Sequence, residues 1–357
     1  MSKMFNELVR RSRRVSRDEF ATDFGGIADD VVEMLNSEQL NEVLQEVRDG
    51  MESAGPLPNN NPRLRQVEFG QFSNATELEI GEVAAIDGTY ALPIQKYSAG
   101  QALCVAVGSL SYRRPMQDSL HYWSSRILLS EASDSDDFIR LEEQGLFGIS
   151  QTAYLRYFEV KHGCDIEEPY LFLDGTLVYE WLVSSQEGVQ LYNKLFESGK
   201  QVLGVIKDIK GSPVFAKFAR ALRTGEIFVV ETLQDHLNQS NAPNRNQGES
   251  RNRYVLDEFK NDIAGDIFRG VFKPRNKAFG FEVHKDHLET MLRIMAADCQ
   301  MNNPGHEIPF LLNRIDEEVR ENFSQRILKD RIAVQMATHS EELFFEETNE
   351  RSFRTPL

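Results

Sequence analysis

The stretch Val83-Ala84-Ala85-Ile86-Asp87-Gly88-Thr89 decides the fold of this chain. Its apolar run is typical of a buried strand, and the strand ends by presenting one carboxylate beside a glycine. The same pattern recurs in Leu171-Phe172-Leu173-Asp174-Gly175-Thr176-Leu177. If the two strands are neighbours in one sheet, their aspartates meet at its edge. Two carboxylates at neighbouring strand ends are the beginning of a divalent-metal site.

An ordinary turn is the alternative explanation for each Asp-Gly pair. Both residue types are favoured in tight turns, so a single copy after a strand is more often a turn than a ligand. Two copies, each after a buried run and in the order that a metal site requires, favour ligands. We therefore take Asp87 and Asp174 as the first two candidate ligands.

The composition is that of a globular protein. The 357 residues are enough for one large domain with insertions or for two ordinary domains. No stretch approaches the roughly 18 apolar residues of a membrane span, and the charged N-terminus lacks the apolar core of a signal peptide. We expect a cytoplasmic protein with no membrane association. Three scattered cysteines, Cys104, Cys164 and Cys299, are expected to be reduced thiols.

The formal net charge of −16 argues against a protein that coats nucleic acid through its overall field. It does not exclude an enzyme that acts on nucleic acid, because basic residues confined to a groove can surround an acidic metal cleft. The other interpretation is that the charge simply keeps the protein soluble.

Three parts follow one another along the chain. Apolar residues recur at three- and four-residue steps over 31–47, and the following 55–62 is rich in Gly, Pro and Asn. We therefore predict a helical arm and linker over 1–62 and a main domain over 63–338. An acidic tail follows over 339–357.

The main domain is predicted to be an α/β fold with a mixed sheet flanked by helices, followed by C-terminal helices. Hairpin connections that give way to helical crossovers are typical of the ribonuclease H-like architecture. The expected strands are 82–87, 91–97 and 101–111 in an antiparallel meander, then 170–174, 201–207, 268–273 and 278–284. The expected helices are 136–162, 185–198, 285–297 and 311–338.

Residues 236–253 are polar and almost free of apolar anchors, which predicts a mobile loop. The loop carries Arg245, Arg251 and Arg253, and on a functional interpretation these side chains contact a nucleic-acid backbone. The alternative is a solvated insertion without a task.

A third carboxylate is expected from the helix between the two aspartates. Two-metal phosphodiester hydrolysis needs several carboxylates around cations roughly 4 Å apart, and hard oxygen ligands select Mn²⁺ or Mg²⁺. The helix offers Glu142, Glu143 and Glu159, each of which can also be a solvated helix residue. Glu159 stands out because it lies shortly before the strand that carries Asp174.

Three further residues are candidates for the same site. Lys207 ends a buried strand, where its cation can contact a scissile phosphate; the alternative is a strand-edge lysine. Asp316 can supply a fourth carboxylate from an extended-then-helical segment. His306 is a weaker candidate, because a lone histidine close to a proline is usually a loop residue.

With these motifs in this order, residues 80–320 resemble the NurA family of nucleases. Ala85-Ile86-Asp87-Gly88-Thr89 and the later Asp-Gly-Thr stretch at 171–177 resemble the family's two aspartate motifs. Arg156-Tyr157-Phe158-Glu159 resembles the helix that brings its glutamate, and Gly204-Val205-Ile206-Lys207 resembles its lysine strand. The C-terminal match departs from the family, which has a Tyr-Pro pair where this chain has Ile308-Pro309. Isoleucine cannot replace a tyrosine hydroxyl.

The resemblance implies a manganese-dependent DNA nuclease with 5′-to-3′ exonuclease and single-strand endonuclease activity. It further implies a homodimer that works with a HerA-type hexameric ATPase in DNA-end processing or phage defence. On this view the carboxylates hold the metals and a lysine steadies the phosphate; these residues are Asp87, Glu159, Asp174, Asp316 and Lys207.

Two other functions compete with this one. A ribonuclease H-like scaffold that has lost catalysis can serve as an interaction subunit, and Ile308 in place of tyrosine favours that idea. A phosphotransferase of the actin-like ATPase type needs a second, glycine-rich phosphate-binding half, which the later chain does not supply. The helical arm and the tail with Phe344-Phe345 are either docking elements for a partner or packed on their own domain.

Overall fold

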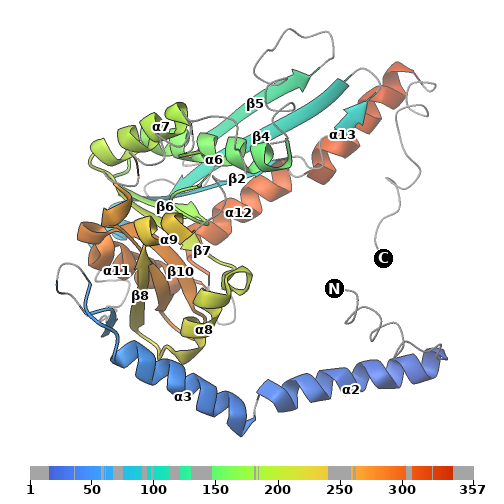
Figure 1. Ribbon diagram of the computed structural model, residues 1–357. Helices are drawn as coiled ribbons and strands as arrows, with labels where there is room; N and C mark the ends of the chain where they lie inside the picture. The colour runs from blue at the N-terminus through green and yellow to red at the C-terminus, as the bar shows by residue number, and fades with distance from the viewer. Residues whose placement is uncertain are drawn as a thin grey trace. The chain divides into compact units, whose positions relative to one another are not determined.

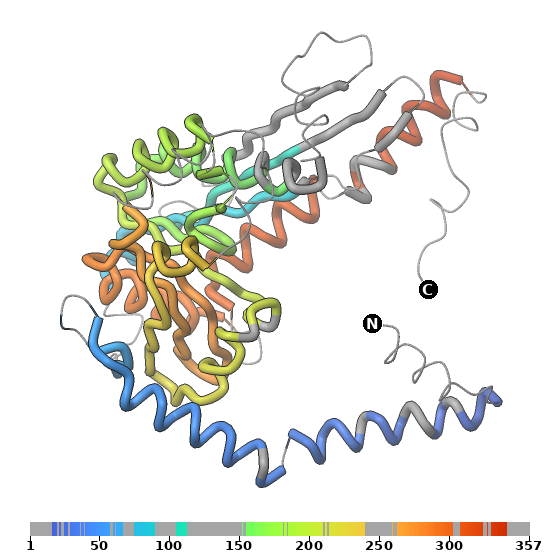
Figure 2. The backbone as a smooth tube through the Cα atoms, in the orientation of Figure 1, coloured from blue at the N-terminus to red at the C-terminus, as the bar shows by residue number. Residues whose placement is uncertain are grey.

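The computed structural model describes most of the chain, whose backbone is traced in Figure 2. It falls into two units, Met1–Ser53 and Ala54–Leu357. The candidates Glu142, Glu143, Arg245, Arg251, Arg253 and His306 and the tail from residue 341 lie outside the described residues. Those residues are 16–35, 37–57, 60, 62–66, 75–90, 95–97, 100–112, 121–129, 147–180, 182–183, 185–239, 259, 263–302, 308–323 and 325–340.

The described residues of the first unit form two capped helices, α2 (Arg17–Leu35) and α3 (Glu38–Glu52). Before α2, Ser16 Oγ accepts a bond from the Glu19 amide at 3.2 Å, and the Glu19 carboxylate accepts one from the Ser16 amide at 2.8 Å. This reciprocal pair is a capping box, which satisfies amides that a helix start leaves free. The predicted helical character of the arm is confirmed.

The second unit is built on a sheet to which ten described strands belong. At its centre three strands run parallel: β2 (Val83–Tyr90), β6 (Tyr170–Asp174) and β7 (Gln201–Ile206). Antiparallel strands extend the sheet on both sides. They are β4 (Gly100–Ser111), β3 (Gln95–Tyr97) and β5 (His121–Leu129) beyond β2, and β10 (Phe279–His284), β9 (Ile267–Lys273), β8 (Glu226–Thr232) and β1 (Leu64–Gln66) beyond β7.

The predicted meander at the start of this unit needs a correction. Strand β3 does not lie between β2 and β4; instead β2 pairs with β4 directly. Both β2 and β3 lie along one side of β4, because β5 occupies its other side over Gln101–Ser109. In effect, β2 and β3 are two parts of one interrupted strand that pairs with β4. The third strand of the meander is β5, which was not predicted from the sequence.

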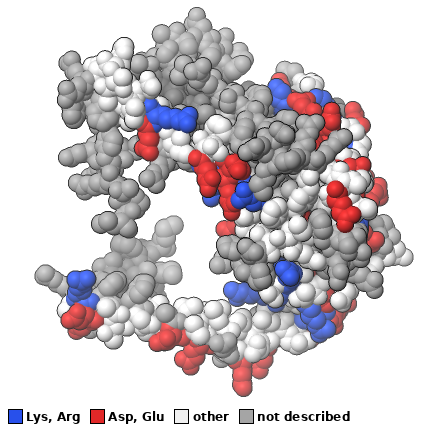
Figure 3. Space-filling view, turned by 180° about the vertical axis from the view of Figure 1, so that it is seen from behind, with Lys and Arg blue, Asp and Glu red and all other residues white. Residues whose placement is uncertain are grey.

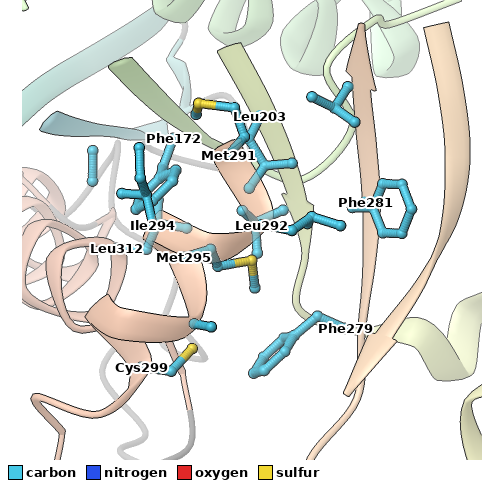
Figure 4. Close-up of a cluster of buried hydrophobic side chains, with 14 of the residues drawn as sticks. Phe172, Leu203, Phe279, Phe281, Met291, Leu292, Ile294, Met295, Cys299 and Leu312 are labelled. Carbon is cyan, nitrogen blue, oxygen red and sulfur yellow. The ribbon is translucent and has the colours of Figure 1, made fainter. Parts of the chain in front are cut away.

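Helices cover both faces of the sheet (Figure 1). On one face α11 (Leu288–Cys299) and α12 (Phe310–Phe323) share a core with strand residues such as Ala85, and Figure 4 shows Met291 and Leu292 of α11 beside Leu203 of β7. On the other face, α6 (Phe147–Asp165), α7 (Gln186–Glu197) and α9 (Leu233–Gln239) pack with residues such as Ile86.

Burial on both faces explains why the central strands read as apolar runs. Successive side chains of a strand point to opposite faces, so Ala85 and Ile86 belong to different core clusters. The expected mixed sheet, with hairpins first and crossovers later, is confirmed as a ribonuclease H-like arrangement. None of the described helices is long and apolar enough to cross a membrane.

Three predicted boundaries change in the structure. The loop expected from residue 236 begins later, because α9 continues to Gln239 and buries Leu237. The helix expected over 311–338 is two helices, α12 and α13 (Gln325–His339). The helix expected from residue 285 begins with a 3-10 turn over Lys285–His287. The sequence analysis also missed α8 (Pro213–Ala221) and β8, although Ser212 caps α8 and a proline opens it, which is a recognisable helix start.

A buried aspartate joins α11, α12 and the end of β4. Asp298 has no exposed surface, and its carboxylate accepts hydrogen bonds from the Tyr112 hydroxyl at 2.8 Å and the Leu311 amide at 3.1 Å. The second bond satisfies an amide in the first turn of α12. Burial raises the pKa of Asp298 to about 7, although the hydrogen bonds from Tyr112 and Leu311 act to lower it.

The raised pKa makes stability depend on pH. Between about pH 4 and pH 7 the folded chain holds a proton on Asp298 that the unfolded chain has released, so this group's contribution is lost as the pH rises. Asp298→Asn keeps a neutral group and should lack this dependence. Relative to wild type, the variant should gain on the order of 2–4 kcal/mol of unfolding free energy between about pH 4 and pH 8. Urea unfolding at both pH values measures it; parallel curves for the two proteins would contradict it.

Candidate metal centre

The two Asp-Gly-Thr strands are direct neighbours. Ile86 pairs with Leu173 in the parallel register of β2 and β6, so the next residues, Asp87 and Asp174, lie at the same level of the sheet. Lys207 directly follows β7, whose Val205 pairs with Asp174. The structure thus brings these three sequence-predicted residues to one edge of the parallel strands.

A third aspartate reaches the same place from a helix. Carboxylate oxygens of Asp87, Asp174 and Asp316 all lie within 4.8 Å of one another. Asp316 belongs to α12, which packs across β2 and β4. It also accepts a bond from Arg320, one turn later on the same helix, at 2.8 Å. Among the described residues this is the group whose geometry suits a metal ion.

A glycine on β4 allows α12 to approach this closely. Gly108 stands opposite Asp87 in the β2–β4 register. A Cβ atom there would lie 2.7 Å from Ile315 Cδ1 and 3.1 Å from Val319 Cγ2, which is closer than van der Waals contact permits. Gly108 was not predicted as part of the site, because a glycine within a strand pattern gives no sign of what it faces.

Glu159 approaches the site from α6 on the other face of the sheet. Its carboxylate is 2% exposed, and Oε1 lies 3.1 Å from where a Cβ of Gly88 would be. Arg156 donates to Glu159 Oε2 at 2.7 Å and also to the carbonyl oxygen of Asp174. Arg156 therefore ties the helix to the aspartate strand. No role was predicted for Arg156 from the sequence, although its spacing of three residues from Glu159 indicated that the two share one helix face.

Asp87 carries an unsatisfied buried oxygen. Its Oδ1 accepts a hydrogen bond from the Gly88 amide at 2.7 Å, whereas its buried Oδ2 has no hydrogen-bond partner. Lys207 Nζ is 3.8 Å from Oδ2 and 2.8 Å from Asp174 Oδ2. Burial raises the pKa of Asp87 well above its usual range, and the charge of Asp174 raises it further. The neighbouring Lys207 only partly offsets these effects.

The other titratable groups show the same excess of negative charge. Burial raises the pKa of Glu159 to about 7, although Arg156 acts to lower it. For Lys207, burial acts to lower the pKa, but the carboxylates of Asp174 and Asp87 outweigh it, so that the pKa is raised. A buried carboxylate cluster of this kind favours an added cation. The donors are all hard oxygens, and Asp87 Oδ2 is unpartnered, so the residues fit Mn²⁺ or Mg²⁺.

The turn after Asp174 is held by close backbone contacts. Gly175 has a φ of +87°, and its amide donates to the Val205 carbonyl at 2.7 Å. Beneath the turn, a Cβ on Gly204 would lie 2.2 Å from the Leu177 nitrogen. Only glycine at both positions lets the chain leave β6 across β7 in this way.

The divergent C-terminal segment also lies in the described part of the chain. The carbonyl of Ile308 accepts a bond from Asn302 Nδ2 at 3.0 Å, just before α12 begins. The segment therefore leads into the helix that carries Asp316, as the sequence predicted, without a hydroxyl at position 308.

No family model matches the sequence, and no curated protein matches it. The structure is similar to that of the NurA nuclease from Sulfolobus solfataricus, with a TM-score of 0.51 at 10% identity over 88% of this chain and 98% of that one. A NurA bound to dAMP and manganese has a TM-score of 0.44 at 10% identity, covering 91% and 97%. The catalytic domain of human endonuclease V has a TM-score of 0.33 at 13% identity, covering 80% and 96%. The fold assignment rests on the first of these, and the fold is NurA-like.

The carboxylate cluster predicts opposite effects of one substitution with and without metal. Asp87→Asn removes a buried carboxylate whose Oδ2 has no hydrogen-bond partner and which resists ionisation beside Asp174, so the metal-free variant should be more stable than wild type by about 1–3 kcal/mol at neutral pH. Saturating Mn²⁺ should stabilise wild type by about 2.7 kcal/mol at a hundredfold excess over Kd, and the variant far less. Thermal unfolding in EDTA and in Mn²⁺ tests both expectations. An equal response of the two proteins to Mn²⁺ would remove Asp87 from the site.

The glycine beneath the turn gives a second test. Gly204→Ala should displace the backbone at Leu177 and with it the neighbouring Asp174, so that Mn²⁺ affinity falls by about tenfold or more. Gly211→Ala is the matched control, because a Cβ there meets nothing within 4 Å. Titration calorimetry with Mn²⁺ on both folded variants measures the difference. Wild-type affinity in Gly204→Ala would show that the turn does not position the site.

Proposed function

We propose that this protein is a metal-dependent nuclease that hydrolyses phosphodiester bonds in DNA. The observation that carries the proposal is the convergence of Asp87, Asp174 and Asp316 beside Lys207, with one buried carboxylate oxygen that has no hydrogen-bond partner. The NurA-like fold supports it, because the first similar structure is that of a nuclease. Neither a membrane nor a small organic ligand is needed to account for this set of residues.

The side chains divide into two roles in this proposal. Asp87, Asp174 and Asp316 hold Mn²⁺ or Mg²⁺, with Glu159 as a further ligand from α6. Bound metal supplies an activated water and stabilises the leaving oxygen. Lys207 offers its ammonium group to the scissile phosphate from the end of β7. Its raised pKa keeps it charged throughout the physiological range.

Arg156 does not contact substrate in this scheme. Its bonds to Glu159 and to the carbonyl of Asp174 fix two candidate ligands that come from different elements. A site of this kind works only when its ligands are held in place by their neighbours, so Arg156 is a positioning residue.

The converging carboxylates favour an active enzyme over the alternative of a scaffold that has lost catalysis. An inactive interaction subunit has no need to maintain Asp87 buried beside Asp174. The remaining features follow from the family resemblance and belong to the proposal: 5′-to-3′ exonuclease and single-strand endonuclease activity, a homodimer, and a HerA-type hexameric ATPase as partner in DNA-end processing or phage defence.

Cleavage assays with carboxylate variants test the enzyme. Wild type should cut single- and double-stranded DNA in the presence of Mn²⁺, and Asp87→Asn and Asp174→Asn should each lose at least about a thousandfold in rate. Asp165→Asn, an exposed aspartate at the end of α6, is the matched control and should cut like wild type. Undiminished cleavage by either site variant would overturn the assignment. The cleavage products of end-labelled strands show whether digestion runs from 5′ to 3′.

A further inference from the structure

Basic residues gather on a surface that follows the lysine of the metal centre. Residues 207–225 and 273–277 contain eight of the chain's 40 Lys and Arg but one of its 56 Asp and Glu. The two segments lie side by side, since the Gly225 amide donates to the Lys273 carbonyl at 2.8 Å and the Thr224 hydroxyl donates to the Arg275 carbonyl at 3.1 Å. Although the chain has a net charge of −16, these two segments together carry a local excess of positive charge.

Helix α8 supplies the centre of this region. Its inner face buries Phe215 and Ala219 and packs against β9. Its outer face exposes Lys217 and Arg220, which are three residues apart and therefore on one side of the helix. The exposed Arg223 continues this side into the connection to β8. We call Lys217, Arg220 and Arg223, with Arg275 and Lys277 of the β9–β10 turn, the α8 basic surface.

Four of these cations lack the ion pairs that the neighbouring arginine makes, whereas Lys277 lies over the Phe279 ring at 5.4 Å from its centroid. Arg269 pairs with Glu231 and Glu282 beneath α8. By contrast, Lys217, Arg220, Arg223 and Arg275 make no ion pair with any described residue. On the face that Figure 3 displays, Lys and Arg side chains lie in several separate groups among acidic and uncharged ones. Clustered like charges repel one another, so the α8 basic surface favours a polyanion.

The α8 basic surface begins close to the metal centre. Lys207, which contacts Asp174 Oδ2 at 2.8 Å, is six residues before Pro213, the first residue of α8. Six residues span at most roughly 20 Å even when fully extended. A nucleic-acid strand that passes the centre therefore needs only a few nucleotides to reach the helix, because phosphates follow one another by about 3.4 Å of helix axis along each strand.

We propose that the α8 basic surface binds the phosphate backbone of the nucleic-acid strand whose scissile phosphate lies at Lys207. This inference rests on the proposed nuclease function and extends its substrate site. Lysine and arginine contacts to phosphates carry no base information, so binding is independent of sequence. An anionic membrane is a poorer fit, because insertion requires several exposed apolar side chains and α8 exposes only Val214 among its described large hydrophobic residues.

A binding experiment without metal tests the surface separately from cleavage. Fluorescence anisotropy of a labelled single-stranded oligonucleotide in EDTA measures Kd from about 50 to 200 mM salt. In Lys217→Gln/Arg220→Gln, affinity at low salt should fall about tenfold. The slope of log Kobs against log salt should become smaller by about 1.4, because about 0.7 is lost for each phosphate contact to a single strand. Oligonucleotides of different sequence should respond alike.

A matched double variant controls for overall charge. Lys161→Gln/Lys194→Gln removes two exposed lysines from α6 and α7, outside the α8 basic surface, and should bind DNA as wild type does. Equal effects of the two double variants would overturn the proposal, since only net charge would matter. Binding to phosphatidylserine vesicles that is lost in Lys217→Gln/Arg220→Gln, with DNA binding unchanged, would assign the surface to a membrane and overturn it as well.

The outcomes separate this proposal from the nuclease assignment. If wild type cuts DNA with Mn²⁺ and Lys217→Gln/Arg220→Gln binds it equally well, the surface is refuted and the nuclease stands. If the variant loses binding as expected but wild type does not cut, the surface stands as a nucleic-acid site and the nuclease assignment fails.

Discussion

The parallel pairing of β2 with β6 is the constraint on which the site depends. It places Asp87 and Asp174 at one level of adjacent strands, inside a sheet that is covered on both faces. Two carboxylates in such a place repel each other and resist ionisation. The pairing is therefore unfavourable for the metal-free chain at this point and must be sustained by the burial of the surrounding apolar core, whose contribution far exceeds one unfavourable contact.

The neighbours of the two aspartates show how the repulsion is contained. Lys207 lies against both carboxylates, and Arg156 bonds Glu159 and the backbone of β6. These cations reduce the negative charge but leave the buried Asp87 Oδ2 without a hydrogen-bond partner. A site that is left short of positive charge is one that gains most from binding a divalent cation.

Close approach, rather than charge, decides which other elements reach the centre. Because Gly108 has no Cβ atom, α12 can pack closely against the strand opposite Asp87. In the same way, Gly204 leaves room for the turn that follows Asp174. Asp298 of α11 accepts a hydrogen bond from the Leu311 amide in the first turn of α12. The helix that carries Asp316 is therefore held at its start as well as along its length. The metal centre is thus a product of packing on both faces of the sheet. Basic residues, in turn, are locally in excess after Lys207, where Lys217 and Arg220 of α8 are exposed.

Sequence alone determined the order of the central elements and the three residues that meet where the parallel pairing of β2 with β6 ends. Apolar runs that stop at Asp87, Asp174 and Lys207 report burial directly, because alternation disappears when both faces of a strand are covered. Asp316 was also predictable from the sequence through its place in a helical segment.

What the sequence pattern could not show is the distance between residues. Contacts between residues far apart in the chain decide which helix glutamate faces the site. They also decide that Arg156 holds this glutamate and that Gly108 faces α12. The same holds for β3 and β5, whose pairing follows from the register of β4. Local pattern sets which side of an element is buried; only the tertiary structure decides what it is buried against, because packing partners are chosen by shape and register across the whole sheet.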